Sequence, residues 1–198
     1  MRSRFEGAIA GFGTSSGSRF VVGRWTTTPW GPFADVMVEQ ADGHRMLLAP
    51  DERVAGFVQA TYSFDEVVRA PVLVEDTADG WHVESDPLDV RLVLGRRTAL
   101  GRLLRLVPRP VATAPWWAGA VDPIARVTLR GVRTRGSART GRREWYAATD
   151  VHAITAVSGT WCGQPVGALR PVDPPVRFGF SSTPASPVVT NVVTTIEH

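Results

Sequence analysis

Short stretches in which apolar and polar residues alternate, separated by frequent turn signals, run along most of this 198-residue chain. Successive side chains of a β-strand point to opposite faces, so a period of two is typical of strands with one buried face. Segments 19–25 and 33–39 show it, and an Asp-Gly turn at 41–44 joins the second of them to 45–49. Because Asp-Gly turns favour tight hairpins, the pattern predicts a mostly β protein.

The alternation continues through the rest of the chain. A second hairpin is predicted from 67–76 and 81–85, on either side of a turn at 77–80. Later segments with the same pattern are 88–95, 125–136, 143–159, 164–172, 175–182 and 187–197. We expect 125–136 to pair with 143–159 across the turn SARTG.

Two segments have helical periodicity instead. Asp51 is a suitable N-cap for a helix over about 51–61, whose apolar residues recur at i, i+3 and i+4. Thr98 can cap a second helix over about 98–107. We find no internal repeat and no long polar linker. We therefore expect one domain, residues 1–198, of the α+β class: mostly β, with a bent antiparallel sheet or barrel and two short helices against it.

Composition limits the chemistry that is open to this chain. It contains no lysine, which excludes both a Schiff base on a side-chain amine and the Walker-type phosphate loop. The net charge is only +3, and the arginines are not interleaved with aromatic residues, which argues against a nucleic-acid partner. The histidines are scattered and Cys162 is the single cysteine, so we expect neither a metal nor a cofactor.

Composition also bears on location. A single cysteine fits a reducing compartment. No apolar run approaches the roughly 20 residues that a membrane helix needs. The lysine-free, arginine-rich composition is typical of a GC-rich bacterial genome. We therefore expect a soluble cytoplasmic protein with no membrane partner.

The strand predicted at 143–159 carries the strongest candidate catalytic site. Its even-numbered positions place Glu144, Tyr146, Asp150 and His152 on one face. Two acids, a phenol and an imidazole inside a barrel can exchange protons near neutral pH, with Asp150 orienting His152. The same pattern is also typical of an ordinary strand that turns its polar face to water. The functional interpretation requires the even positions to face a cavity.

Arginines and a tryptophan pair supply candidate ligand-binding groups. A guanidinium can bind a carboxylate through two hydrogen bonds, and loop aromatics can cover a pocket. Solvated charges and loop packing are the structural alternatives. The candidate ligand-binding residues are Arg96, Arg97, Arg133, Trp116 and Trp117.

The glycine- and serine-rich segment 11–18 is not expected to bind a nucleotide. Its G-x-G-x-x-x-G spacing is one residue longer than the dinucleotide fingerprint. A strand-like segment follows it, so no helix N-terminus is available for a pyrophosphate. We expect a flexible loop or a β-bulge there.

The late segments RVTLRGVRTRG, REWYAATDVHAITAVSG, PVRFGF and VVTNVVTTIE together resemble, in their layout, the acetoacetate-decarboxylase-like superfamily. The resemblance implies a cone-shaped, bent antiparallel barrel with a polar interior that carries arginines. The decarboxylases of that family use a lysine as the Schiff-base nucleophile, and this chain has none. The resemblance therefore implies a cavity for a small organic acid, with arginine as the partner of its carboxylate, and not the family's signature reaction.

Two functional hypotheses follow from the sequence. The first is a barrel that binds a small molecule, with a carboxylated one as a candidate, either as a binding protein or as a lysine-independent acid–base enzyme. The alternative is a non-catalytic homodimeric interaction module that uses the arginine-rich hairpin 126–143 and an exposed sheet edge.

Overall fold

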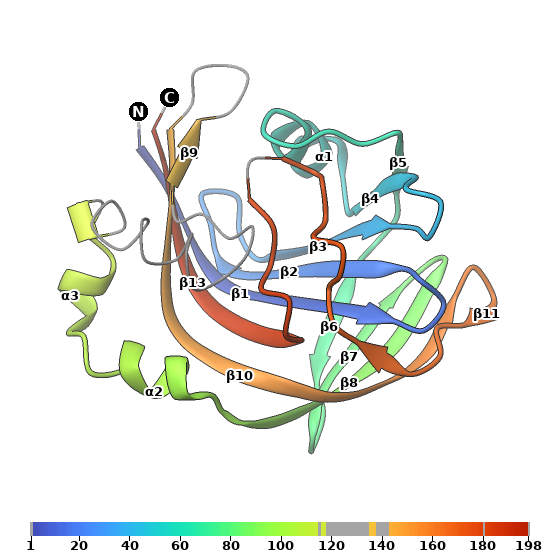
Figure 1. The fold of residues 1–198 in the computed structure, drawn as a ribbon. Helices are drawn as coiled ribbons and strands as arrows, with labels where there is room; N and C mark the ends of the chain where they lie inside the picture. Colours follow the sequence, from blue (N-terminus) through green and yellow to red (C-terminus); the bar gives the residue numbers. More distant parts are fainter. Residues whose placement is uncertain (1, 115, 118–134, 138–142, 180, 198) are drawn as a thin grey trace.

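A curled β-sheet forms most of the molecule (Figure 1). The computed structural model describes residues 2–114, 116–117, 135–137, 143–179 and 181–197. The strands are β1 (Arg2–Thr14), β2 (Arg19–Thr27), β3 (Phe33–Glu39), β4 (Arg45–Ala49), β5 (Glu66–Arg69), β6 (Leu73–Asp76), β7 (Gly80–Ser85), β8 (Leu88–Arg97), β9 (Arg135–Ser137), β10 (Arg143–Trp161), β11 (Gln164–Pro165), β12 (Leu169–Arg170) and β13 (Val188–Glu197). Short helices are α1 (Glu52–Gln59), α2 (Ala99–Leu104) and α3 (Arg109–Ala112).

The strands pair in the order β5-β4-β3-β2-β1-β13-β10-β8-β7-β6, with β9 and β11 beside β10 and β12 beside β1. Neighbours along this path are antiparallel except β4 and β5, which are parallel. Within the described residues the end strands β5 and β6 do not pair with each other, so the sheet forms an open half-barrel. The expectation of a mostly β, α+β fold with a bent sheet is confirmed.

Local capping chemistry explains where both predicted helices begin. The Asp51 carboxylate accepts a hydrogen bond from the Val54 amide at 2.9 Å, and the Thr98 hydroxyl accepts one from the Gly101 amide at 3.0 Å. Helix α2 ends earlier than expected, and Leu106, which follows it, is 78% exposed. The one-turn helix α3 was not predicted. Among the described residues, no helix has the length and apolar character needed to span a membrane.

Strand β1 is the main element that the sequence pattern does not predict. It lies between β2 and β13 in the middle of the sheet, where both of its faces are covered. Phe5 packs on one face while Ala10 and Phe12 pack on the other, which hides the simple alternation of a half-buried strand. The prediction of a loop at 11–18 is therefore wrong for residues 11–14, which belong to β1. The chain turns only after Thr14.

The segment 175–182 is also predicted wrongly, because its described residues form no strand. It instead lies across β2, where Val176 and Phe178 are buried against Val21. The pairing expected for 125–136 is confirmed only at its end, since β9 pairs with the start of β10. The remainder of that segment lies outside the described residues.

The inner face of the curled sheet holds the largest core. Residues from both ends of the strand path meet there: Phe12, Phe20 and Val36 from one half pack with Val83 and Leu92 from the other. All five side chains are at most 1% exposed. Burial of this apolar surface is the main stabilising term for the curl.

The outer face of β1 to β4 is covered by two separate pieces of chain. Helix α1 packs Val54 and Val58 against Leu47 of β4. The segment 171–179 packs Val176 and Phe178 against β2. The two small cores share partly buried neighbours, and the space between them contains the hollow described below.

A fully buried carboxylate holds the segment 171–179 to the sheet. Glu39, at the end of β3, is 0% exposed and lies 3.2 Å from the Arg19 guanidinium. Its other oxygen accepts a hydrogen bond from the Arg177 amide at 2.7 Å. The Arg177 side chain also donates from Nε to the first oxygen at 3.2 Å, so two arginines compensate the desolvation of the Glu39 charge.

A second ion pair crosses the half-barrel. Arg24 of β2 donates two hydrogen bonds to Asp76 of β6, at 2.6 and 2.8 Å, and its guanidinium lies 5.6 Å from the ring centre of Trp81. Asp76 is well exposed and its pKa is lowered, chiefly by the hydrogen bond from Arg24. This pair connects two strands that are far apart along the path.

We expect Glu39→Gln to lower the free energy of unfolding by about 3–5 kcal/mol, because the buried Arg19 loses its counter-ion. The matched control is Glu52→Gln, which breaks the exposed pair with Arg69 and should change stability by less than about 1 kcal/mol. Urea unfolding followed by tryptophan fluorescence measures both values. Equal effects of the two substitutions would contradict the structural role of Glu39.

Candidate functional site

A β-bulge in β10 divides the four predicted catalytic residues. Tyr146 lies opposite Thr194 of β13, but Asp150 lies opposite Asn191, so one residue of β10, Thr149, has no counterpart on β13. Residues directly opposite each other share a face, and an extra residue reverses the alternation. Tyr146 therefore faces outward toward α1, whereas Asp150 and His152 face the inner side. The prediction that all four share one face is wrong.

Asp150 forms an ion pair of its own at the inner face. It is 5% exposed, and both of its oxygens accept hydrogen bonds from Nε of Arg97, at 2.8 and 3.0 Å. His152 Nε2 lies 3.6 Å from the same carboxylate. Burial raises the pKa of Asp150, but the hydrogen bonds from Arg97 and from the Val151 amide, together with the nearby positive charge, outweigh it, and the net pKa is lowered. Such a carboxylate is a weak base, so this geometry supports anchoring of β8 to β10. Catalysis by Asp150 and His152 stays a prediction.

The other predicted residues do not converge on this pair. Arg96 is exposed, and Trp116 is 64% exposed and contacts Trp117 edge to face. The side chain of Glu144 and the whole of Arg133 lie outside the described residues. The ligand-binding roles of these residues stay predictions.

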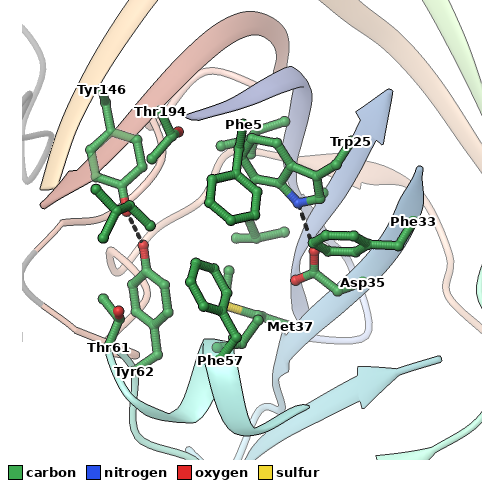
Figure 2. A pocket seen from close by; sticks show the side chains of 15 residues that line it. Phe5, Trp25, Phe33, Asp35, Met37, Phe57, Thr61, Tyr62, Tyr146 and Thr194 are labelled. Atoms are coloured by element: carbon green, nitrogen blue, oxygen red, sulfur yellow. Dashed lines mark hydrogen bonds between the residues drawn. The ribbon is translucent and has the colours of Figure 1, made fainter. Parts of the chain in front are cut away.

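A hollow of about 60 Å³, here called the α1 pocket, lies between helix α1 and the outer face of the sheet (Figure 2). A water molecule needs roughly 10–15 Å³ of such space, so the pocket can hold a few waters or a small organic molecule. Most of its wall is apolar or aromatic. Its lining residues are Phe5, Ile9, Val21, Gly23, Trp25, Phe33, Asp35, Met37, Phe57, Val58, Thr61, Tyr62, Tyr146, Thr194 and Ile196.

Asp35 is the buried acid in this wall. It is 3% exposed, and its Oδ1 accepts a hydrogen bond from the Trp25 indole at 3.0 Å. Among the described residues no donor binds its second oxygen. Burial raises the pKa of Asp35 to about 7, and the Trp25 hydrogen bond opposes this rise only in part. Near neutral pH the carboxyl group therefore occupies both protonation states.

Gly23 makes room for this carboxyl group. It lies opposite Asp35 in the pairing of β2 with β3. A methyl group at this position would lie 2.5 Å from Asp35 Oδ1 and 2.7 Å from the indole nitrogen of Trp25. The hydrogen bond between Trp25 and Asp35 thus occupies the space that a side chain at position 23 would fill.

Polar groups also lie across the pocket from Asp35. The hydroxyl groups of Tyr62 and Tyr146 are hydrogen-bonded to each other (Figure 2). The buried hydroxyl of Thr194 has no hydrogen-bond partner among the described residues. The pocket therefore combines an apolar wall with a few polar atoms, which is typical of small-molecule sites.

Of the residues that line the α1 pocket, sequence reasoning named Tyr146 as a candidate and did not name Asp35. The signal for Asp35 is a lone acid within the otherwise apolar strand segment FADVMVE. Its position opposite a glycine could not be read from the sequence, because the pairing of β2 with β3 sets it.

A wider and more open cleft of about 850 Å³ lies beside α2 and α3 and is lined by both acids and arginines. Arg109 lies 2.6 Å from Glu6, and Arg105 lies 3.8 Å from Asp150. Because these arginines already face carboxylates of the protein, they offer little uncompensated positive charge. In the described part of the chain, no group of three or more His, Cys, Asp or Glu side chains is placed to hold a metal ion.

Comparison with family models and with curated proteins finds no match. Among solved structures, the fold resembles the crystal structure of acetoacetate decarboxylase from Legionella pneumophila. The two chains are 10% identical, the match covers 99% of this chain and 82% of that one, and the TM-score is 0.39.

The raised pKa of Asp35 makes stability depend on pH. In the unfolded chain this acid ionises near its usual value of 3.8, whereas in the folded protein it keeps its proton up to about pH 7. The wild type should therefore lose stability as pH rises between these values, by a total on the order of 4 kcal/mol from this group.

We expect Asp35→Asn, which cannot ionise and keeps an oxygen for the Trp25 indole, to remove this contribution. The stability difference between variant and wild type should grow from acid to alkaline pH. Urea unfolding at several pH values measures it. Parallel pH profiles for the two proteins would show that folding does not raise the pKa of Asp35.

We expect Gly23→Ala to destabilise the protein by about 1–3 kcal/mol, because the added methyl group displaces the Trp25–Asp35 hydrogen bond. Gly56→Ala is the matched control, since a methyl group there meets no atom within 4 Å and α1 gains about 0.5–1 kcal/mol from the removal of a helical glycine. Thermal unfolding compares the two. A tolerated alanine at position 23 would contradict the geometry of the pocket wall.

Proposed function

We propose that this protein binds a small, largely apolar molecule in the α1 pocket, where Asp35 forms the polar contact or exchanges a proton with it. The observation that supports this most directly is a buried carboxyl group whose second oxygen has no hydrogen-bond donor among the described residues, in the wall of an apolar hollow. Ionisable groups with strongly shifted pKa values cluster at functional sites.

Two roles are compatible with this geometry. In a binding protein, Asp35 orients the ligand through a hydrogen bond or a charge. In an enzyme, a carboxyl group with a pKa of about 7 can accept a proton from the substrate and return it at another atom. The phenols of Tyr62 and Tyr146 are the other titratable groups in the described wall of the pocket.

The geometry does not favour a carboxylated ligand in the α1 pocket. No arginine or histidine is among the described lining residues, and a second carboxylate near Asp35 would be repelled. The homodimer hypothesis stays a prediction, because most of the hairpin 126–143 lies outside the described residues.

We expect tert-butanol, a compact neutral molecule, to bind the α1 pocket weakly, as its few atoms allow. Saturation-transfer NMR detects it, because the aromatic protons of the wall pass magnetisation to the methyl groups of the probe. Ile9→Trp fills the pocket from the sheet, and Thr61→Trp fills it from the segment after α1. Both substitutions should abolish the transfer of magnetisation to tert-butanol. Cooperative unfolding of each variant shows that it is still folded.

The control for this experiment is Leu73→Trp, which adds the same bulk at a position that is 55% exposed and absent from the pocket lining. It should leave the transfer unchanged. Equal transfer to tert-butanol in all four proteins, or no transfer in the wild type, would overturn the proposed site.

A further inference from the structure

Aromatic rings form a large part of the α1 pocket wall. The rings of Phe5 and Phe57 are stacked with centres 4.8 Å apart, and Trp25 meets Phe5 edge to face at 6.1 Å. Phe33 lies 6.4 Å from Trp25, and Tyr62 also lines the hollow. The face of an aromatic ring is electron-rich and attracts a cation that lies within about 6 Å of its centre. A pocket walled in this way suits a positively charged organic group.

Among the described residues, no cationic side chain neutralises the charge of Asp35. Three carboxylic acids are buried in the described part of the chain, and two of them have an arginine partner. Glu39 lies 3.2 Å from Arg19, and Asp150 lies 2.8 Å from Arg97. Asp35 contacts only the neutral indole of Trp25 in this part of the structure.

Arg24, the arginine beside Gly23, faces the opposite way. Arg24 follows Gly23 in β2, so its side chain points to the inner face, where it binds Asp76 at 2.6 Å. The charged residues of α1, Glu52 and Arg53, are exposed. Because the described residues supply no cation to the Asp35 carboxylate, a molecule inside the pocket can act as its counter-ion.

We infer that the ligand of the α1 pocket is a small organic cation, a protonated or methylated amine, held by the Asp35 carboxylate and the surrounding aromatic rings. This inference rests on the proposed function, and it names the chemical class of the ligand. A neutral molecule would leave the ionised acid without a partner, and an anion would be repelled by it. An amine instead supplies the charge that Arg19 and Arg97 supply to the other two buried acids.

Binding of a cation makes the site depend on pH. The cation prefers the ionised carboxylate, so affinity rises as pH increases through about 7, the pKa of Asp35. The other titratable groups that face the pocket are the phenols of Tyr62 and Tyr146, from the segment after α1 and from β10. The described lining residues from β1, β2 and β13 carry no titratable side chain.

The test compares tert-butylammonium with tert-butanol, which have nearly the same shape and differ in charge. At about pH 8.5 the ammonium ion should bind about tenfold tighter or more, and at about pH 5.5 this preference should largely disappear. In Asp35→Asn the preference should fall to the smaller part that the aromatic rings supply and should no longer change with pH, while tert-butanol still binds. Glu75→Gln removes an exposed carboxylate of β6 and should behave as the wild type. NMR titrations give the four dissociation constants for each protein.

The possible results separate the two proposals. Equal affinity of the wild type for both probes at high pH, or a preference for the ammonium ion that is undiminished in Asp35→Asn, would overturn the cation inference and leave the proposed binding site intact. Failure of both probes to bind the wild type would overturn the proposed function as well. A preference that follows pH and requires Asp35 supports the inference.

Discussion

Coverage of both faces of β1, β2 and β3 is the constraint on which the rest of this structure depends. Side chains alternate along these strands, so each strand contributes to two cores at once. The inner core forms when the sheet curls and brings β7 and β8 onto β1 to β3. In the part of the chain that the structure describes, the outer face is covered by α1 and by the segment 171–179 and not by a second sheet. Glu39 holds that segment in place through Arg177.

The α1 pocket follows from this two-part cover. A helix and an irregular segment do not fill the outer face as completely as a packed sheet would, and the remaining hollow contains one acid. Asp35 fits there because its neighbour on β2 is Gly23 and because Trp25 can donate to it. The ionised carboxylate is destabilising for the fold, since no arginine of the described residues compensates it. Asp35 lies in the wall of a cavity and not in a packed core, and for this reason we relate it to ligand binding.

The features that depend on local sequence were predictable. Hairpins with an Asp-Gly turn and helices capped by Asp51 and Thr98 involve residues close in the chain, and these predictions are confirmed. Features that depend on pairing between distant strands were not. Strand β1 is buried on both faces and lacks the expected alternation. Nothing in the sequence around Thr149 indicates a β-bulge. The bulge nevertheless places Tyr146 and Asp150 on opposite sides of the sheet.

The pair formed by Arg24 and Asp76 has a consequence for the shape of the half-barrel. Strands β2 and β6 have no backbone hydrogen bonds between them, and this partly exposed ion pair is a polar link across the gap. Exposed ion pairs are weakened by dissolved salt, whereas backbone ladders and apolar cores are far less sensitive to it. Dissolved salt should therefore weaken this link between β2 and β6 more than it weakens the apolar cores on the two faces of the sheet.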